Sequence, residues 1–449
     1  MKKRLVALAL TSAIIFGLVG CGSGSTSNSS TSSTSTDTSS QSTTSSSESG
    51  DSDDEDAIKI GFLTPLSGDT ATYGKQVKCA GDMIVDLVNN ARPEMHMALA
   101  KDAGLPNLNN KKIKIVVADT KGDPSTAASE AKRLITEEGV VAMTGQYTSA
   151  ITKAVAVVTE NYGIPLVTAG SSPSLTSSDT NFQWYFRFCP NDTTFIEDSF
   201  DYLDELNKQG YNLKTVGFAC EDTEFGTYIR REMERISGEH GYDVACDIQY
   251  SASATNVSAE VMKIKEANPD VLMMSSYSSD AILYFKTFKE QNWCPKMLLG
   301  QRGGFIQTDF LNTMGENTEN IFTTAGWSSD IQTDTVKELV EEYKKYTPDG
   351  SELSEGHTKD MTDLLMICIA MNQAGSSEPE KVREAIKNLD IDTTTLPIPW
   401  TGIKFDEYGQ NIEANGFIVQ MRDQKYQTVY PGDYAAIEPK LPMTGWGKQ

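Results

Sequence analysis

The chain has 449 residues, and its 39 lysines and arginines stand against 62 aspartates and glutamates, which gives a formal net charge of −23. Because phosphate binding needs a basic face, this acidic balance argues against nucleic acid as a partner. About 390 residues follow the polar N-terminal segment, too many for one compact core and enough for two lobes.

The chain begins with the pattern of a bacterial signal peptide. Basic residues up to Arg4 precede an apolar run over residues 5–20, which is shorter than the ~20 residues that span a bilayer. The run ends in Leu-Val-Gly before Cys21, which is similar to the bacterial lipobox. We expect residues 1–20 to be a lipoprotein signal peptide and Cys21 to carry a lipid anchor; an ordinary secretory signal is the alternative.

Residues 21–57 are almost wholly Ser, Thr, Gly, Asp and Glu. A segment of this composition cannot bury enough apolar surface to fold, so it is predicted to be a disordered tether. No later stretch is apolar enough to form a second span, since residues 364–371 are flanked by Asp363 and Asn372. The sequence therefore predicts an extracytoplasmic domain that is lipid-anchored to the bacterial cell membrane.

Strand patterns alternate with helix patterns from residue 57 onward. One helical pattern begins with Pro124, a residue favoured in the first turn of a helix. Such alternation predicts right-handed βαβ units and a parallel sheet. The strands are expected at residues 57–66, 112–120, 140–145 and 164–170, with helices at 74–90, 124–138 and 149–163.

The same alternation starts again at residue 184, which predicts a second lobe. The fold class is therefore α/β, with two doubly wound parallel-sheet lobes. Strands are expected at residues 184–189, 215–220, 242–250, 269–276 and 296–301, with helices at 193–210, 223–241, 258–267 and 280–291. The last third is expected to form helices near 331–346, 357–374 and 379–388, followed by short strands at 403–410 and 417–430.

Neither the cysteines nor the histidines are grouped like metal ligands. None of the cysteines forms a C-x-x-C pair, and the three histidines are isolated in sequence, so we expect no metal and no cofactor. Export permits disulfides, and Cys220 with Cys246 would meet if their strands are neighbours; free or buried thiols are the favoured reading. The cysteines after Cys21 are Cys79, Cys189, Cys220, Cys246, Cys294 and Cys368.

The sequence lacks the motifs of two common kinds of enzyme site. A phosphate loop needs G-x-x-x-x-G-K-[ST], but five residues separate Gly68 from Gly74, and Gln76 stands where the hydroxyl belongs. The nucleophile elbow G-x-S-x-G is absent, and a Ser-His-Asp triad would have to use His240 or His357. We therefore expect no catalytic residues.

Residues 58–86 resemble the opening of the type I periplasmic binding proteins of the Leu/Ile/Val-binding family. These proteins begin with a strand, a P-L-S-G turn and a Y-G pair that opens the first helix, and the pair here is Tyr73 and Gly74. The resemblance continues through residues 118–135, 144–178 and 186–192, and with lower specificity through 221–233, 268–291 and 405–410. It therefore covers nearly all of the chain after the tether.

The resemblance implies two lobes joined by three crossings. In this sequence the crossings are expected near residues 189, 325 and 399. The first lobe would then comprise residues 58–188 and 326–398. The second lobe would comprise residues 189–325 and 399–449.

The resemblance also implies a ligand site in the cleft between the lobes. Its residues follow strand ends, where open parallel sheets bind their ligands. Hydroxyls beside the amides of helix N-termini suit a carboxylate without a buried cation. The implied ligand-binding residues are Tyr73, Ser149, Gly170 and Ser172 in the first lobe, Asp222, Phe225, Tyr277 and Arg302 in the second, and His357 or its neighbours Thr358 and Lys359.

Arg302 departs from the family pattern. Where branched-chain amino-acid binders of this family carry an acidic residue for the ligand's ammonium group, this chain has Arg302. An arginine repels an ammonium group and favours a second acidic group on the ligand. Asp222 or Asp280 would have to supply the anion if the ligand is an amino acid.

The function implied by the family is capture of a small solute. We expect a monomeric, non-enzymatic subunit of an ABC importer that binds an amino acid or related carboxylate and works with a permease and an ATPase. A binder of another organic acid or amide, or a sensory lipoprotein that reports to a membrane receptor, is the alternative. A surface hydrolase is the remaining hypothesis, and it would depend on His357.

Overall fold

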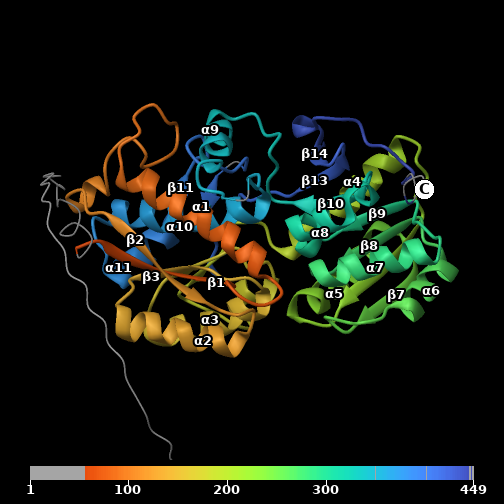
Figure 1. The fold of residues 1–449 in the computed structure, drawn as a ribbon, viewed down its shortest axis with the longest axis horizontal. Helices are drawn as coiled ribbons and strands as arrows, with labels where there is room; N and C mark the ends of the chain where they lie inside the picture. Colours follow the sequence, from red (N-terminus) through yellow and green to blue (C-terminus); the bar gives the residue numbers. More distant parts are fainter. Residues whose placement is uncertain (1–55, 349, 401, 444–445, 447–449) are drawn as a thin grey trace, which may run out of the picture. The chain divides into compact units, whose positions relative to one another are not determined.

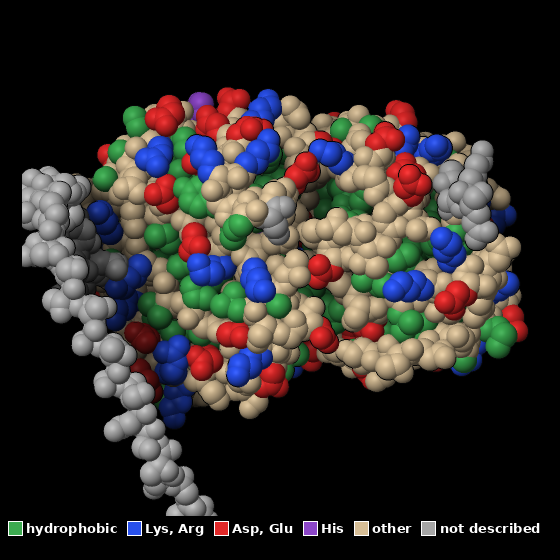
Figure 2. All heavy atoms as spheres, viewed as in Figure 1, with side chains coloured by type: hydrophobic (Ala, Val, Ile, Leu, Met, Phe, Trp, Pro, Cys, Tyr) green, Lys and Arg blue, Asp and Glu red, His purple; other side chains and the backbone are tan. Residues whose placement is uncertain are grey.

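The computed structural model describes residues 56–348, 350–400, 402–443 and 446, which belong to one compact unit, Gly50–Gln449. The predicted signal peptide, the anchor at Cys21 and the tether up to residue 55 lie outside the described residues. Within the described part, no helix has the length and apolar character that a membrane crossing needs. On the face drawn in Figure 2, acidic and basic side chains are mixed without a continuous basic area.

A five-stranded parallel sheet forms what we call the first lobe (Figure 1). Its strand order is β2-β1-β3-β4-β5, and every neighbouring pair is parallel. The alternation expected from the sequence is confirmed for the first four strands, because a helix follows each of β1, β2 and β3 before the next strand begins. The strands are β1 (Ile58–Thr64), β2 (Ile113–Asp119), β3 (Ala142–Gly145), β4 (Leu166–Val167) and β5 (Tyr185–Phe186).

Helices cover both faces of this sheet. The pair α2 and α3 packs on one face, and α1 with α10 packs on the other, where α9 and α11 join them. Helix α10 is buried from Glu355 to Met371, which explains its apolar residues on all sides. The helices are α1 (Ala71–Asn89), α2 (Pro124–Arg133), α3 (Ser149–Tyr162), α9 (Asp334–Tyr343), α10 (Glu355–Ala374) and α11 (Pro379–Lys387).

A seven-stranded sheet forms the second lobe, in the order β14-β13-β10-β9-β8-β6-β7. Its central strands are parallel, but β13 and β14 are antiparallel, because only the two residues Asp423 and Gln424 connect them. The strands are β6 (Thr215–Glu221), β7 (Asp243–Tyr250), β8 (Val271–Ser275), β9 (Met297–Gly300), β10 (Phe322–Ala325), β13 (Phe417–Arg422) and β14 (Lys425–Tyr430).

Helices also cover both faces of the second sheet. One face carries α4 and α5, and the other carries α6, α7 and α8, each group with its own apolar core. These helices are α4 (Asp192–Lys208), α5 (Glu224–His240), α6 (Ser258–Ala267), α7 (Ser278–Glu290) and α8 (Thr308–Met314).

The third crossing lies later than the sequence predicted. The chain leaves the first sheet between β5 and α4 and returns to the first lobe between β10 and α9. However, β12 (Ile403–Lys404) pairs with β11 (Asp390–Ile391), and Arg187 N donates to Gly409 O at 2.8 Å. Residues 403–411 therefore belong to the first lobe, and the assignment of 399–449 to the second lobe begins too early.

In the described part, Cys220 and Cys246 are free thiols, as are the buried Cys189 and Cys368. Strands β6 and β7 are neighbours, as the disulfide alternative required, but the register places Cys220 opposite Gln249 and Cys246 opposite Gly217. Because the two residues are offset along the ladder, their side chains do not meet. The reading as free or buried thiols is thus confirmed for these four cysteines.

Gly74 is predicted to be required for folding. A Cβ at this position would lie 1.8 Å from Pro65 O, because the first turn of α1 packs directly on the turn after β1. We expect Gly74→Ala to lower the free energy of unfolding by several kcal/mol, about the size of a severe packing defect. Gly238→Ala, on α5, is the matched control: its Cβ meets nothing within 4 Å, so it should stabilise by about 0.5–1 kcal/mol. Equal melting temperatures for the two variants would contradict this prediction.

Candidate functional site

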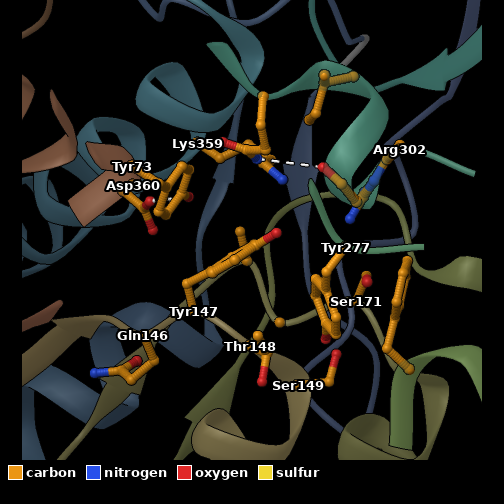
Figure 3. Close-up of a pocket in the computed structure, with 16 residues that line it drawn as sticks. Tyr73, Gln146, Tyr147, Thr148, Ser149, Ser171, Tyr277, Arg302, Lys359 and Asp360 are labelled. Carbon is orange, nitrogen blue, oxygen red and sulfur yellow. Dashed lines mark hydrogen bonds between the residues drawn. The ribbon is translucent and has the colours of Figure 1, made fainter. Parts of the chain in front are cut away.

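A pocket lies between the two lobes, at the carboxyl ends of strands from both sheets. The empty space inside it, open mouth included, is about 500 Å³, and its position is where open parallel sheets bind their ligands. Figure 3 shows its side chains converging from both lobes. The lining residues are Tyr73, Gln146, Tyr147, Thr148, Ser149, Ala169, Gly170, Ser171, Phe225, Tyr277, Arg302, Gly303, Ile306, Gln307, Lys359 and Asp360.

Helix α3 directs its N-terminus at this pocket. The residue before the helix, Thr148, has extended backbone, and its side chain makes no capping bond. The first N–H groups of α3 are therefore available to an external acceptor, and the helix dipole adds positive potential there. Thr148 and Ser149 lie together at one end of the pocket (Figure 3). This end suits the oxygens of a carboxylate.

A fully buried arginine fixes the turn after β4. Arg187 donates from Nη1 to Gly170 O at 2.7 Å and to Ser172 O at 2.8 Å, and Tyr185 Oη donates to Gly170 O at 3.1 Å. These bonds draw the carbonyl oxygens of the turn away from the pocket. Arg187 therefore positions the residues that line it, although it does not line the pocket itself.

Four aromatic side chains form a continuous wall across the two lobes. The ring centroids of Tyr73 and Tyr147 are 4.4 Å apart, those of Tyr147 and Tyr277 5.8 Å, and those of Tyr277 and Phe225 5.7 Å. Rings at these separations attract one another and exclude water. The wall gives the pocket an aromatic side, in which the rings are tilted or edge-on to one another.

Two basic side chains share one carboxylate beside the pocket. Glu355 Oε1 lies 3.8 Å from Arg302 Nε and 3.4 Å from Lys359 Nζ, and the side chains are at most 10% exposed. The Arg302 guanidinium also lies over the Phe195 ring, 4.2 Å from its centroid. Among the described residues, Nε and Nη1 of Arg302 and both carboxylate oxygens of Glu355 lack a hydrogen-bond partner. The cations of this group are therefore held loosely.

Asp360 is the acidic residue that lines the pocket. Tyr73 Oη donates to Asp360 Oδ2 at 2.6 Å, which joins α1 to α10. Burial raises the pKa of Asp360 to about 6, although the bond from Tyr73 and the charge of Lys359 lower it. Burial and the nearby Asp360 raise the pKa of Tyr73 well above its usual value, so the phenol stays protonated and donates.

The structure brings most of the predicted residues to this pocket. Six of the predicted ligand-binding residues line it, from both lobes, and Lys359, named as a neighbour of His357, lines it too. Their role in binding stays a prediction, because no ligand is present. The six are Tyr73, Ser149, Gly170, Phe225, Tyr277 and Arg302.

Three predicted residues lie elsewhere. Asp222 is exposed and accepts from Ala252 N at 2.9 Å, within a turn of the second lobe. Ser172 is buried behind Ser171, with its hydroxyl 3.0 Å from Ser174 Oγ. The ring of His357 caps its own helix, α10. None of these three residues lines the pocket, so we leave them out of the proposed site.

Sequence reasoning missed Tyr147 and Asp360. Tyr147 is the second residue after β3, so the rule that ligands bind beyond strand ends would have found it. Asp360 gave no such signal, because it lies inside a helix and contacts Tyr73 across 287 positions of sequence. Other lining residues also lie in loops or at helix starts, as Tyr147 does. They are Gln146, Thr148, Ser171 and Gln307.

Among the described residues, the pocket offers a single carboxylate and no histidine or cysteine, which does not make a metal site. Asp201, Asp204 and His240 approach one another on α4 and α5, away from the pocket. There His240 Nδ1 lies 2.8 Å from Asp204 Oδ2, so a hydrogen bond within the protein accounts for this contact.

Buried carboxyl groups predict a protein that is more stable at mildly acidic pH. Burial raises the pKa of Asp198 and Glu221 to about 7 and that of Asp280 and Asp360 to about 6. Between these values and the unfolded pKa near 4, the folded state binds more protons, so the free energy of unfolding falls as pH rises. We expect a higher melting temperature at pH 5 than at pH 8.

The Asp198→Asn variant should lose part of this difference, because it removes one of the titrating groups. Asp119 and Asp270 have lowered pKa values, but carboxyl groups with a pKa below the usual value near 4 are ionised throughout pH 5 to 8 and add no difference there. A melting temperature that rises steadily from pH 5 to pH 8 would show that the buried carboxyls do not control stability.

Known proteins are similar to this chain over most of its length. The family model described as "Periplasmic binding protein" matches residues 57–426. The chain is 28% identical over 395 residues to Leu/Ile/Val-binding protein homolog 8 of Brucella abortus, which covers 86% of this chain and 93% of that protein. Homolog 7 of Brucella suis is 26% identical over 397 residues, with 86% and 94% covered.

Solved structures superpose over most of the chain. The leucine-binding protein LivK of Thermotoga maritima has a TM-score of 0.70 at 19% identity, covering 83% of this chain and 98% of its own. LivJ of Streptococcus pneumoniae, in complex with isoleucine, has a TM-score of 0.68 at 20% identity, covering 84% and 100%. A solute-binding protein of R. palustris, in complex with benzoate, has a TM-score of 0.69 at 15% identity, covering 83% and 95%. With its two-sheet architecture and its pocket between the lobes, the chain belongs to the type I periplasmic binding protein family.

Proposed function

We propose that this protein is an extracytoplasmic solute-binding lipoprotein of an ABC importer, which captures a small carboxylate by closure of its two lobes. The observation that carries this proposal is the pocket, whose walls come from both lobes and whose one end is the uncapped N-terminus of α3. Amino acids and benzoate, found in related structures, differ in shape but share a carboxylate. That shared group matches the donors at this end.

Contacts between the lobes support a closing motion. Ser174 Oγ donates to Glu224 Oε1 at 2.7 Å, and Lys153 Nζ lies 3.1 Å from the same oxygen. Exposed pairs of this kind contribute little free energy each, so they do not hold the lobes closed alone. A ligand that contacts both lobes would favour the closed form by its difference in affinity for the two forms. The permease would then recognise the closed form.

The proposal includes no catalysis. Within the part of the chain that the structure describes, none of the histidines lines the pocket. His357, on which a hydrolase would depend, lies 3.2 Å from Gln76 Oε1 and packs on Tyr343. A general base has to reach the proton that it abstracts, and this ring is used in holding α10 to its neighbours.

The first test of the function is a thermal-shift screen followed by calorimetry. Probes are L-isoleucine, benzoate and other small amino acids and carboxylates. We expect at least one to raise the melting temperature, and Ser149→Ala to weaken its binding about tenfold or more, because a hydrogen bond to a charged group is lost.

Asp222→Ala is the matched control for Ser149→Ala, because Asp222 follows a strand in the same way but is exposed outside the pocket. Its affinity should equal that of the unmodified protein. A folded protein that binds none of the probes would overturn the proposed function. Equal loss of affinity in both variants would place the site elsewhere.

The lipid anchor is tested separately. We infer from the apolar run over residues 5–20 and the following cysteine that Cys21 is acylated. Cys21→Ser should move the protein from the detergent phase to the aqueous phase on phase partition of bacterial membranes, because the acyl chains are its only proposed membrane contact. Retention of the variant in the detergent phase would exclude acylation at Cys21 as the anchor.

A further inference from the structure

The pocket offers unmet donors at two separate places. One is the N-terminus of α3, where Thr148 makes no capping bond. The other is Arg302, whose Nε and Nη1 have no acceptor among the described residues although the side chain is only 6% exposed. In Figure 3, Arg302 and Lys359 lie above Tyr147, and Thr148 and Ser149 lie below it. Both places attract negative charge.

Two donors of Arg302, Nε and Nη1, have no acceptor within hydrogen-bond distance among the described residues. Arg302 and Lys359 share one oxygen of Glu355, at distances too long for hydrogen bonds. Leaving buried charged donors without acceptors is costly, and a carboxylate that accepts from the guanidinium fork relieves that cost. The carboxylate oxygens Glu355 Oε1 and Oε2 and Asp192 Oδ2 are also buried without a donor in the part of the chain that the structure describes, so the acceptors nearby do not reach the donors of Arg302, and a ligand carboxylate would meet those donors.

One carboxylate cannot satisfy both places, because Tyr147 lies between them. The space between the two ends is lined by the rings of Tyr73, Tyr147 and Tyr277, which suit an apolar or flat body. Asp360 does not offer its Oδ2 to a ligand cation without competition, because that oxygen accepts a hydrogen bond from Tyr73. An ammonium group would have to compete with Tyr73 for Asp360 while facing Lys359.

We propose that the solute carries two acidic groups, one bound at the N-terminus of α3 and the other by Arg302 and Lys359, with an apolar body against the tyrosine wall. This inference rests on the proposed function and narrows it to a substrate class, small dicarboxylates. Arg302 then selects the ligand, because it stands where an acidic residue would select an ammonium group.

Matched probes test this inference by calorimetry on the purified protein. The pairs are glutarate against pentanoate and isophthalate against benzoate, with L-isoleucine as the probe that carries an ammonium group. We expect the better-fitting diacid to bind about tenfold or more tightly than its monoacid partner, the gain from one charge-assisted contact. The monoacids are matched in length or ring, so apolar contact alone would give equal affinities.

Arg302→Gln should reduce the diacid affinity to that of the monoacid, and Arg302→Lys should keep part of the difference. Ser149→Ala should weaken diacid and monoacid alike, because both use the α3 end. The control is Arg231→Gln, an exposed arginine of α5 whose loss should change neither affinity. Circular dichroism melts identify a variant that fails to fold, and Arg302→Lys then carries the test because it keeps the charge.

The outcomes separate the two claims. If L-isoleucine or the monoacids bind and the diacids bind no more tightly, the dicarboxylate inference is wrong while the solute-binding function stands. If the diacid preference survives in Arg302→Gln, Arg302 does not select the ligand and the inference is equally wrong. If no probe binds the folded protein, the proposed function itself fails.

Discussion

The buried side chain of Arg187 joins the three features on which the site depends. Arg187 belongs to the segment after β5 and forms no ion pair with a carboxylate of the described residues. It donates hydrogen bonds to the pocket turn, and to Gln410 Oε1 at 2.7 Å. Asn411 N donates back to Arg187 O at 2.9 Å. One residue thus ties the first crossing, the third crossing and the turn that lines the pocket. A buried charge is tolerated there because fixed carbonyl and amide oxygens replace its water.

This arrangement explains why the third crossing lies after residue 411. The resemblance to the family implied a third crossing near residue 399, which assigned the turn at Gly409 to the second lobe. In the structure the turn folds back along residue 187, with Gln410 Nε2 donating to Cys189 O at 3.0 Å. Such pairing between distant segments depends on tertiary contacts and leaves no periodic pattern in the sequence.

The sequence was informative where chemistry follows from strand direction. The alternation of strands and helices predicted both sheets, and the resemblance to the Leu/Ile/Val-binding family implied Tyr73, Ser149 and Tyr277, which line the pocket and lie beyond strand ends. It failed at single-residue resolution. After β6 the buried Glu221 accepts from Thr223 N while Asp222 points to solvent, and on α10 the pocket positions are 359 and 360 instead of 357. Neighbouring residues of a turn or helix face different directions, and composition does not say which one faces inward.

The loosely held charges bear on how the lobes close. Arg302 comes from the second lobe, and Glu355 and Lys359 come from the first, so closure brings them together and removes water from all three. Without a ligand, that step leaves donors and acceptors unpaired, which is unfavourable in a buried site. In the proposed closure, a ligand that supplies an acceptor for Arg302 would favour the closed form by its difference in affinity for the two forms. Selection of the solute and the signal that the lobes have closed would then depend on the same side chain, Arg302.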